Sequence, residues 1–271
     1  MPIPDVSDRS IPALISLTAR TAVVTGGARN IGLAIVRRLV EAGARVVICD
    51  PAEAEGAAAV EYLRSLGGAA EFMWTDVRDS KSVATVADGV VDAYGGIDIW
   101  VNSAGMFPTK PALEMLDEDW DQMMAVNLRG TFLGAREAAR RMVSQGRPGV
   151  VVNIGSCAGF RTGGIGLSNY VASKFGVRGL TQALAAEFGV HGIRVIGVAP
   201  TYIERREAAR IHLSDPDAGM EERPPNLRFE LPLGRAGVPD DVARVVLFCA
   251  SDLALLMTGS TIPVDAGQLA L

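Results

Sequence analysis

Residues 21–32, Thr21-Ala22-Val23-Val24-Thr25-Gly26-Gly27-Ala28-Arg29-Asn30-Ile31-Gly32, decide the fold of this chain. A β-branched apolar run is followed by a glycine-rich turn and then by a helical pattern. In that context the turn can bring backbone N–H groups against a pyrophosphate at a helix N-terminus. A tight turn that needs glycine only for its geometry is the structural alternative. Nucleoside triphosphate use is disfavoured, because Leu33-Ala34 stand where a phosphate-transfer loop needs Lys and Ser/Thr.

Outward from this stretch, short apolar runs alternate with longer helical patterns. The sequence predicts seven strands, at 21–24, 45–49, 70–74, 97–101, 150–154, 194–199 and 261–264. It predicts helices near 31–42, 53–66, 80–94, 118–144, 170–190 and 239–250. Such alternation is typical of βαβ units, so we expect an α/β fold with a doubly wound, seven-stranded parallel sheet of the Rossmann-like type.

Composition restricts the class of protein. The 271 residues carry a formal net charge of −5 and are 49% hydrophobic, which favours a globular protein and argues against a nucleic-acid or anionic-membrane partner. Three cysteines without metal-ligand spacing and only two histidines predict no metal site and suit the reducing cytoplasm. No apolar run is long enough to span a bilayer.

No linker, repeat or composition break divides the chain, so we expect a single dinucleotide-binding and catalytic domain over residues 1–271. Residues 1–19 are predicted to form an irregular N-terminal arm, because acidic residues and prolines interrupt a short apolar piece. Residues 201–232, rich in proline and charge, follow a strand end where such sheets place ligands. We expect this segment to be a substrate lid, with a structural insertion as the alternative.

Acidic residues follow two of the predicted strands. Asp50 ends the second strand, where a carboxylate can accept hydrogen bonds from the adenosine ribose and would repel a 2′-phosphate. This favours NAD over NADP, although Arg29 in the turn could pair with a 2′-phosphate. Asp76, followed by Val77, could bind the adenine amino group; the alternative is an N-cap for the helix near Ser80.

Tyr170 and Lys174 are four residues apart, a spacing that directs both side chains to one face of a helix. A fixed cation about 4 Å from a phenol, at an effective dielectric constant of about 20, favours the phenolate by roughly 4 kcal/mol, or about three pKa units. We therefore expect Lys174 to lower the pKa of Tyr170 enough for proton exchange near neutral pH. Alone, the same spacing also occurs on ordinary amphipathic helices.

The order and spacing of these motifs resemble the short-chain dehydrogenase/reductase family over nearly the whole chain, from about Leu17 to Gly267. The cofactor turn of that family matches residues 25–32, and its Asn-Asn-Ala-Gly stretch matches Asn102-Ser103-Ala104-Gly105. The resemblance implies hydride transfer between nicotinamide and a secondary alcohol or ketone. It also implies association through the helices near 118–144 and 170–190 into a homotetramer, with a dimer as the alternative.

The resemblance carries catalytic roles to four positions: Asn127, Ser156, Tyr170 and Lys174. Tyr170 would be the general acid and base, Ser156 would hydrogen-bond the substrate oxygen, Lys174 would bind the nicotinamide ribose, and Asn127 would bind a water that links Lys174 to solvent. The expected cofactor-binding residues are Gly26, Arg29, Asn30, Ile31, Gly32, Asp50, Asp76, Val77, Asn102, Ala104, Gly105, Tyr170, Lys174, Pro200 and Ile203.

Several positions depart from the family pattern. Asn30 replaces the middle glycine of the turn, but asparagine tolerates the left-handed geometry. Thr201 follows Pro200 where the family has glycine, and Arg205 stands where a threonine commonly contacts the nicotinamide carboxamide. Substrate contacts are expected from five residues that follow strands: Met106, Phe107, Phe160, Arg161 and Tyr202.

The expected function is an NAD-dependent alcohol dehydrogenase or ketone reductase acting on an aromatic or otherwise apolar small molecule. An NADPH-dependent ketone or 3-oxoacyl reductase is the enzymatic alternative. From another class, the departures at Thr201 and Arg205 suggest a catalytically weakened dinucleotide-sensing or scaffolding protein.

Overall fold

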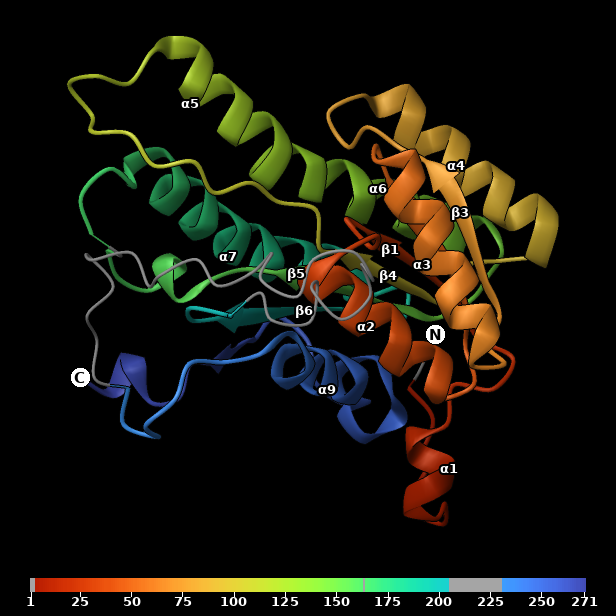
Figure 1. Ribbon diagram of the computed structural model, residues 1–271. Helices are drawn as coiled ribbons and strands as arrows, with labels where there is room; N and C mark the ends of the chain where they lie inside the picture. The colour runs from red at the N-terminus through yellow and green to blue at the C-terminus, as the bar shows by residue number, and fades with distance from the viewer. Residues whose placement is uncertain (1–2, 163, 205–230) are drawn as a thin grey trace.

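Seven parallel strands form one sheet at the centre of the computed structural model, which describes residues 3–162, 164–204 and 231–271 (Figure 1). The strand order is β3-β2-β1-β4-β5-β6-β7, and every neighbouring pair is parallel. The bounds are β1 Thr21–Thr25, β2 Arg45–Asp50, β3 Ala70–Trp74, β4 Ile99–Asn102, β5 Gly149–Ile154, β6 Ile193–Pro200 and β7 Thr261–Val264. The predicted fold class and all seven strands are confirmed.

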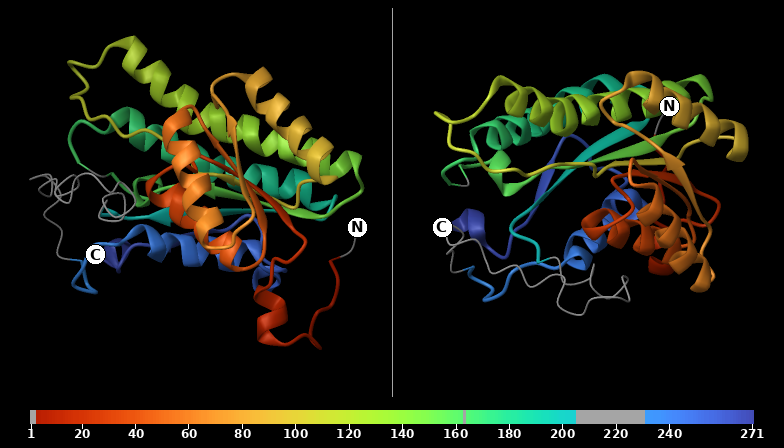
Figure 2. Two further views of the ribbon diagram at one scale, coloured as in Figure 1. Left: turned by 45° about the vertical axis from the view of Figure 1, so that its right-hand side comes forward. Right: turned by 45° about the horizontal axis from the view of Figure 1, so that its top comes forward.

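Helices cover both faces of the sheet (Figures 1 and 2). The described α-helices are α1 Ile11–Ile15, α2 Asn30–Glu41, α3 Glu53–Ser65, α4 Ser80–Tyr94, α5 Asp117–Met124, α6 Gly130–Ser144, α7 Ser168–Gly189 and α9 Pro239–Ala250. Helices α2, α3 and α9 form one layer, and α4, α6 and α7 form the other. No helix in the described ranges is long and apolar enough to cross a membrane.

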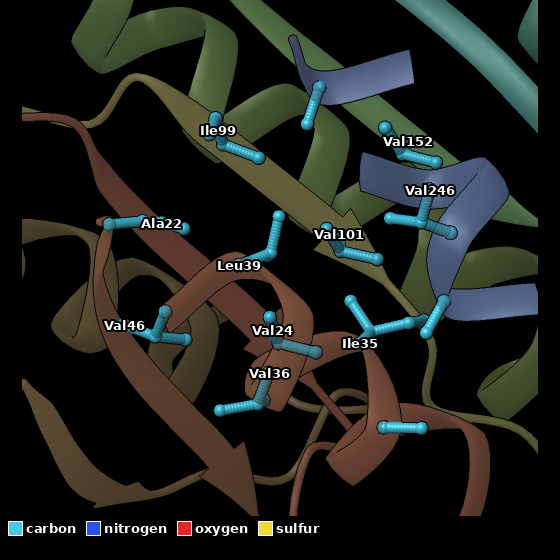
Figure 3. Packing of buried hydrophobic residues seen from close by; sticks show 14 of the residues in the cluster. Ala22, Val24, Ile35, Val36, Leu39, Val46, Ile99, Val101, Val152 and Val246 are labelled. Atoms are coloured by element: carbon cyan, nitrogen blue, oxygen red, sulfur yellow. The ribbon is translucent and has the colours of Figure 1, made fainter. Parts of the chain in front are cut away.

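Alternation along the strands builds a separate core on each face. Successive strand side chains point to opposite sides, so a sheet covered on both faces needs apolar residues at nearly every position. Val24 and Val46 accordingly pack with Ile35 of α2 and Val246 of α9, as Figure 3 shows. The intervening residues pack against α4, α6 and α7 and include Val23, Val47, Trp100 and Val151.

The predicted helix over residues 118–144 is divided. A π-helical turn, Ala125–Arg129, separates α5 from α6. The N-terminal arm is also more regular than predicted. Ser10 caps the short helix α1, and Leu17, within the arm, is fully buried in the core. Of the predicted lid, residues 205–230, including Arg205, lie outside the described residues.

Candidate functional site

The glycine-rich turn and the loop after β4 meet at the carboxyl edge of the sheet. Strand β1 pairs with both β2 and β4, which makes this the place where the strand order reverses. Gly26 has a φ of +65°, and a Cβ there would lie 2.7 Å from the Cα of Ala104. The Thr25 hydroxyl oxygen accepts hydrogen bonds from the N–H groups of Ser103 and Ala104, each at 3.2 Å. Sequence reasoning missed this role of Thr25.

Two buried acceptors fit a dinucleotide in this turn. Asn30 has a φ of +50°, as its replacement of glycine required, and its buried Oδ1 has no hydrogen-bond partner among the described residues. The Asp50 carboxylate is 4% exposed and accepts hydrogen bonds from Ala28 N at 3.4 Å and Ala52 N at 3.1 Å. Among the described residues it forms no ion pair, so its acceptor capacity suits ribose hydroxyls. Arg29 is exposed.

Asp76 lies after β3 but does not cap α4. Asp79 is the N-cap, and its side chain accepts a hydrogen bond from Lys81 N. The alternative interpretation of Asp76 as the cap is therefore wrong. Its carboxylate pairs with Arg78 at 2.7 Å, and hydrogen bonds from Arg78 hold its pKa below the ordinary value. The neighbouring Val77 side chain packs against Gly130 at the start of α6.

The Asn102 side chain belongs to a buried polar network on the α6–α7 side of the sheet. Its Oδ1 accepts a hydrogen bond from Trp100 Nε1 at 2.8 Å, and its Nδ2 donates to Asn153 Oδ1 at 2.9 Å. Asn153 Nδ2 in turn donates to Thr181 Oγ1 at 3.0 Å. The Asn102 side chain is thereby occupied, which leaves its backbone as the part that could meet a cofactor. Asn153, a lone amide in an apolar strand pattern, was the signal that could have revealed this network.

Asn127 and Lys174 surround Gly105, in the loop after β4. A Cβ on Gly105 would lie 3.6 Å from Asn127 Oδ1 and 3.9 Å from Lys174 Nζ. Asn127, in the π-helical turn, accepts a hydrogen bond from Met106 N at 2.9 Å and donates one to Met106 O at 3.1 Å. The Lys174 ammonium is buried and donates to Ile154 O, at the end of β5, at 2.9 Å. Burial lowers the pKa of Lys174 to about 8.

Tyr170 and Ser156 meet in front of Lys174. Tyr170 lies in the first turns of α7 and is partly buried, while Ser156 caps the short 3-10 helix after β5 and lies close enough to the phenol to affect its pKa. Burial raises the pKa of Tyr170, and the nearby Ser156 hydroxyl opposes this shift without cancelling it. The expectation that Lys174 lowers the pKa of Tyr170 is therefore wrong for this structure. Burial is the largest cause of the shift, and Lys174 Nζ donates its hydrogen bond to Ile154 O while it lies over the phenol ring, 5.7 Å from the centroid.

Phe107 is the one predicted substrate residue, in the part of the chain that the structure describes, whose ring packs against the phenol. The rings of Phe107 and Tyr170 meet edge to face, with centroids 4.4 Å apart and an interplanar angle of 83°. Phe160 instead packs under the guanidinium of Arg178, 4.2 Å from its ring. Arg161, one residue further on, donates from its backbone N–H to Cys157 O at 3.2 Å.

The remaining predicted residues lie at the end of β6. Pro200 is the last residue of the strand. Tyr202 is half-buried, and its carbonyl accepts a hydrogen bond from Gly237 N at 3.2 Å. Ile203 forms a β-bridge with Gly237 and packs against the core under α2 and α9. The structure thus brings the four catalytic candidates to one edge of the sheet, beside the glycine-rich turn.

Comparisons with known proteins agree with this arrangement. The family model described as enoyl-(acyl carrier protein) reductase matches residues 26–268. The chain is 36% identical to the 3-oxoacyl-(acyl-carrier-protein) reductase FabG of Chlamydia pneumoniae over 93% of this chain and 98% of that protein. It is 41% identical to the galactitol 2-dehydrogenase of Rhizobium johnstonii, over 93% of this chain and 95% of the relative.

Solved structures show the same likeness. A short-chain type dehydrogenase/reductase from Mycobacterium marinum superimposes with a TM-score of 0.84 at 32% identity, covering 96% of this chain and 98% of that one. Fold, motif positions and relatives therefore agree along nearly the whole length. This chain is a member of the short-chain dehydrogenase/reductase family of oxidoreductases.

Proposed function

We propose that this protein is an NAD-dependent oxidoreductase that interconverts a secondary alcohol and a ketone, with Tyr170 as general acid and base. The observation that carries the proposal is that Ser156 and Tyr170 lie together beside buried Lys174, at the edge that also holds the glycine-rich turn. Two hydroxyl groups that converge there can both bond to one substrate oxygen.

In this proposal Tyr170 moves the proton at the substrate oxygen. Bound at the turn and at Asp50, the dinucleotide supplies or accepts the hydride. Ser156 donates a hydrogen bond to the substrate oxygen and stabilises the charge that develops there during carbonyl reduction. Because burial raises its pKa, Tyr170 is protonated at neutral pH and is ready to donate its proton to that oxygen. Below about pH 8 Lys174 is charged, and its proposed role is to bind the nicotinamide ribose.

The choice of NAD over NADP rests on Asp50. A buried carboxylate can accept hydrogen bonds from the two ribose hydroxyls but repels a 2′-phosphate. Exposed Arg29 supports the NADPH-dependent alternative, since a guanidinium can pair with that phosphate. Titration of both cofactors into wild type and into Asp50→Ala decides between them. Preference for NAD that weakens in the variant supports the proposal, and preference for NADP in the wild type contradicts it.

An apolar group on the substrate carbon is the best match to the surface beside the phenol. Phe107 is 45% exposed although it packs against Tyr170, so its remaining ring surface is open to a ligand. The names of the relatives include a 3-oxoacyl reductase and a sugar-alcohol dehydrogenase, so both classes belong in the substrate panel. A 3-oxoacyl reductase is therefore retained as the second candidate function.

The remaining proposals concern assembly and compartment. We propose a homotetramer, because α6 and α7 expose Phe132, Val143 and Phe175 on the layer that covers β4 and β5. The chain's three cysteines are all free and buried, which supports a reducing compartment such as the cytoplasm.

Replacement of Tyr170 by Phe tests the catalytic assignment. The variant keeps the ring and its packing against Phe107 but loses the proton donor, so turnover should fall by about 10²–10⁴-fold. NADH affinity, followed by nicotinamide fluorescence, should stay within about twofold, because the substitution leaves the glycine-rich turn, Asp50 and Lys174 unchanged. Tyr62→Phe on α3 is the matched control and should retain full turnover. Undiminished turnover in Tyr170→Phe would refute the assignment.

A further inference from the structure

The C-terminal segment contacts the end of β6 through a buried amide. Gln268 is only 8% exposed although it is the fourth residue from the C-terminus, and its Oε1 accepts a hydrogen bond of 2.6 Å from Thr201 Oγ1. Thr201 N also donates to Val264 O at 3.1 Å. The residue that follows β6 is therefore held by its backbone and by its side chain.

A turn before Gln268 fixes the direction of that amide. The Asp265 carboxylate accepts hydrogen bonds from Gly267 N at 3.1 Å and from Leu269 N at 2.7 Å. Ala266 and Gly267 have φ values of +51° and +89°, so the backbone reverses sharply there. A non-glycine residue such as Ala266 adopts this conformation only at a cost, which the surrounding bonds offset.

The same strand end supports the loop that carries Ser156. Gly155 N donates to Val198 O at 2.7 Å, and Cys157 Sγ donates to Ala199 O at 3.5 Å. Displacement of the β6 end would therefore move both the Ser156 loop and residues 200–203. A shift of about 1 Å in groups remote from the reacting atoms can cost up to 10²-fold in rate, because catalysis depends on alignment.

We propose that Thr201 and Gln268 are a positioning pair for hydride transfer, which they support by fixing the backbone between the Ser156 loop and Ile203. This role rests on the proposed oxidoreductase function. The proposed role also explains why this chain has Thr201 where the family has glycine, since glycine has no hydroxyl that could bond to Gln268.

The test compares Thr201→Val and Gln268→Leu, which keep side-chain size but remove the hydrogen bond. With a substrate found in the panel, kcat should fall about threefold to tenfold in each variant, the effect expected of one neutral hydrogen bond. The dissociation constant for NADH should stay within about twofold. The double variant should be no slower than either single variant, because the two groups act as one unit. Thr201→Ser retains a hydroxyl and should recover wild-type kcat.

Thr258→Val is the matched control for lost stability. Thr258 Oγ1 accepts a hydrogen bond from Val195 N at 3.0 Å near the opposite end of β6, so its removal should lower Tm without changing kcat. Folded Thr201→Val and Gln268→Leu variants with wild-type kcat, beside an active wild type, would overturn the positioning role alone. A wild type without turnover on any substrate with either cofactor would refute the proposed function and this role together.

Discussion

Lys174 carries a charge inside the protein that burial disfavours. Its spacing from Tyr170 correctly predicted one helix face, but it could not predict where a four-carbon side chain ends. That end point depends on the Ile154 carbonyl, which belongs to a different element. The sequence also could not show that both groups are buried, which raises the pKa of Tyr170 and lowers that of Lys174.

Substitution of Lys174 by Met should separate stability from activity. The pKa of Lys174 falls from 10.5 to about 8, so the buried charge costs roughly 3 kcal/mol at pH 7. The unfolded chain binds more protons than the folded one between these pH values, so the free energy of unfolding of the wild type should rise from pH 8 to 10.5. Urea unfolding without cofactor should show this rise in the wild type only.

In the same experiment the free energy of unfolding of Lys174→Met should exceed that of the wild type by about 1–2 kcal/mol at pH 7. The buried charge is gone, although some packing is lost. Its turnover should drop about 10²-fold or more. A variant that is less stable than the wild type at pH 7, or one that keeps the pH-dependent rise, would contradict the assignment of this cost to Lys174.

The raised pKa of Tyr170 also predicts opposite pH profiles for the two directions of reaction. The phenol stays protonated through the neutral range, so ketone reduction should be insensitive to the Tyr170 ionisation there. Alcohol oxidation needs the phenolate and should accelerate with rising pH. Initial rates at saturating cofactor between pH 6 and 10 check this. An oxidation rate that is flat across this range would show that binding lowers the Tyr170 pKa below it.

Short sequence patterns predicted the site residues whose roles depend on neighbours in the sequence or on their position at a strand end. Asp50 and Ser156 follow strand patterns, and Asn30 replaces a glycine of the turn. The roles of Thr25 and Gln268 were missed, because their partners lie 78 and 67 residues away and a hydroxyl or an amide has no pattern of its own. The packing of Phe160 under Arg178 was missed for the same reason.

At the scale of elements, the π-helical turn is the largest difference from the sequence-based expectation. Strand positions were predictable because both faces of the sheet are buried and each strand is a continuous apolar run. The turn Ala125–Arg129 has no proline or other helix-breaking signal. It inserts extra backbone into an otherwise regular helix, a feature frequent at functional sites, and here it contains Asn127, whose side chain holds Met106.

The close contact of α6 with the sheet predicts that one added methyl group, at Gly134, lowers the stability of the fold. A Cβ on Gly134 would overlap Asn102 Oδ1 and lie 2.6 Å from Trp100 Nε1. Gly134→Ala should therefore cost about 1–3 kcal/mol or more of unfolding free energy, since close-packed polar groups cannot yield without loss of their bonds. Chemical denaturation measures this cost.

Gly179→Ala on α7 is the matched control. A Cβ there meets nothing within 4 Å, so the exchange should stabilise the protein by about 0.5–1 kcal/mol through helix propensity. Equal effects of the two substitutions would show that the buried network does not restrict α6.

At the scale of the whole molecule, the exposed apolar side chains of α6 and α7 predict association. Phe175 is 43% exposed on α7, and a charge there should weaken an interface formed by this layer. Sedimentation velocity at micromolar concentration should show a tetramer for the wild type and smaller species for Phe175→Glu. Leu66→Glu, at a residue 58% exposed beyond α3 on the other layer, should leave the tetramer intact. A wild-type monomer would refute the assembly.

The packing of α9 against α2 has a consequence for biosynthesis. Ile35 and Leu39 of α2 are covered in part by α9, which begins at Pro239 (Figure 3). A ribosome must add roughly 200 residues after α2 before this cover emerges, which takes about 10–40 s at ordinary elongation rates. During that interval the nascent chain presents an apolar helix face, so chaperone engagement should persist until the last segment leaves the exit tunnel.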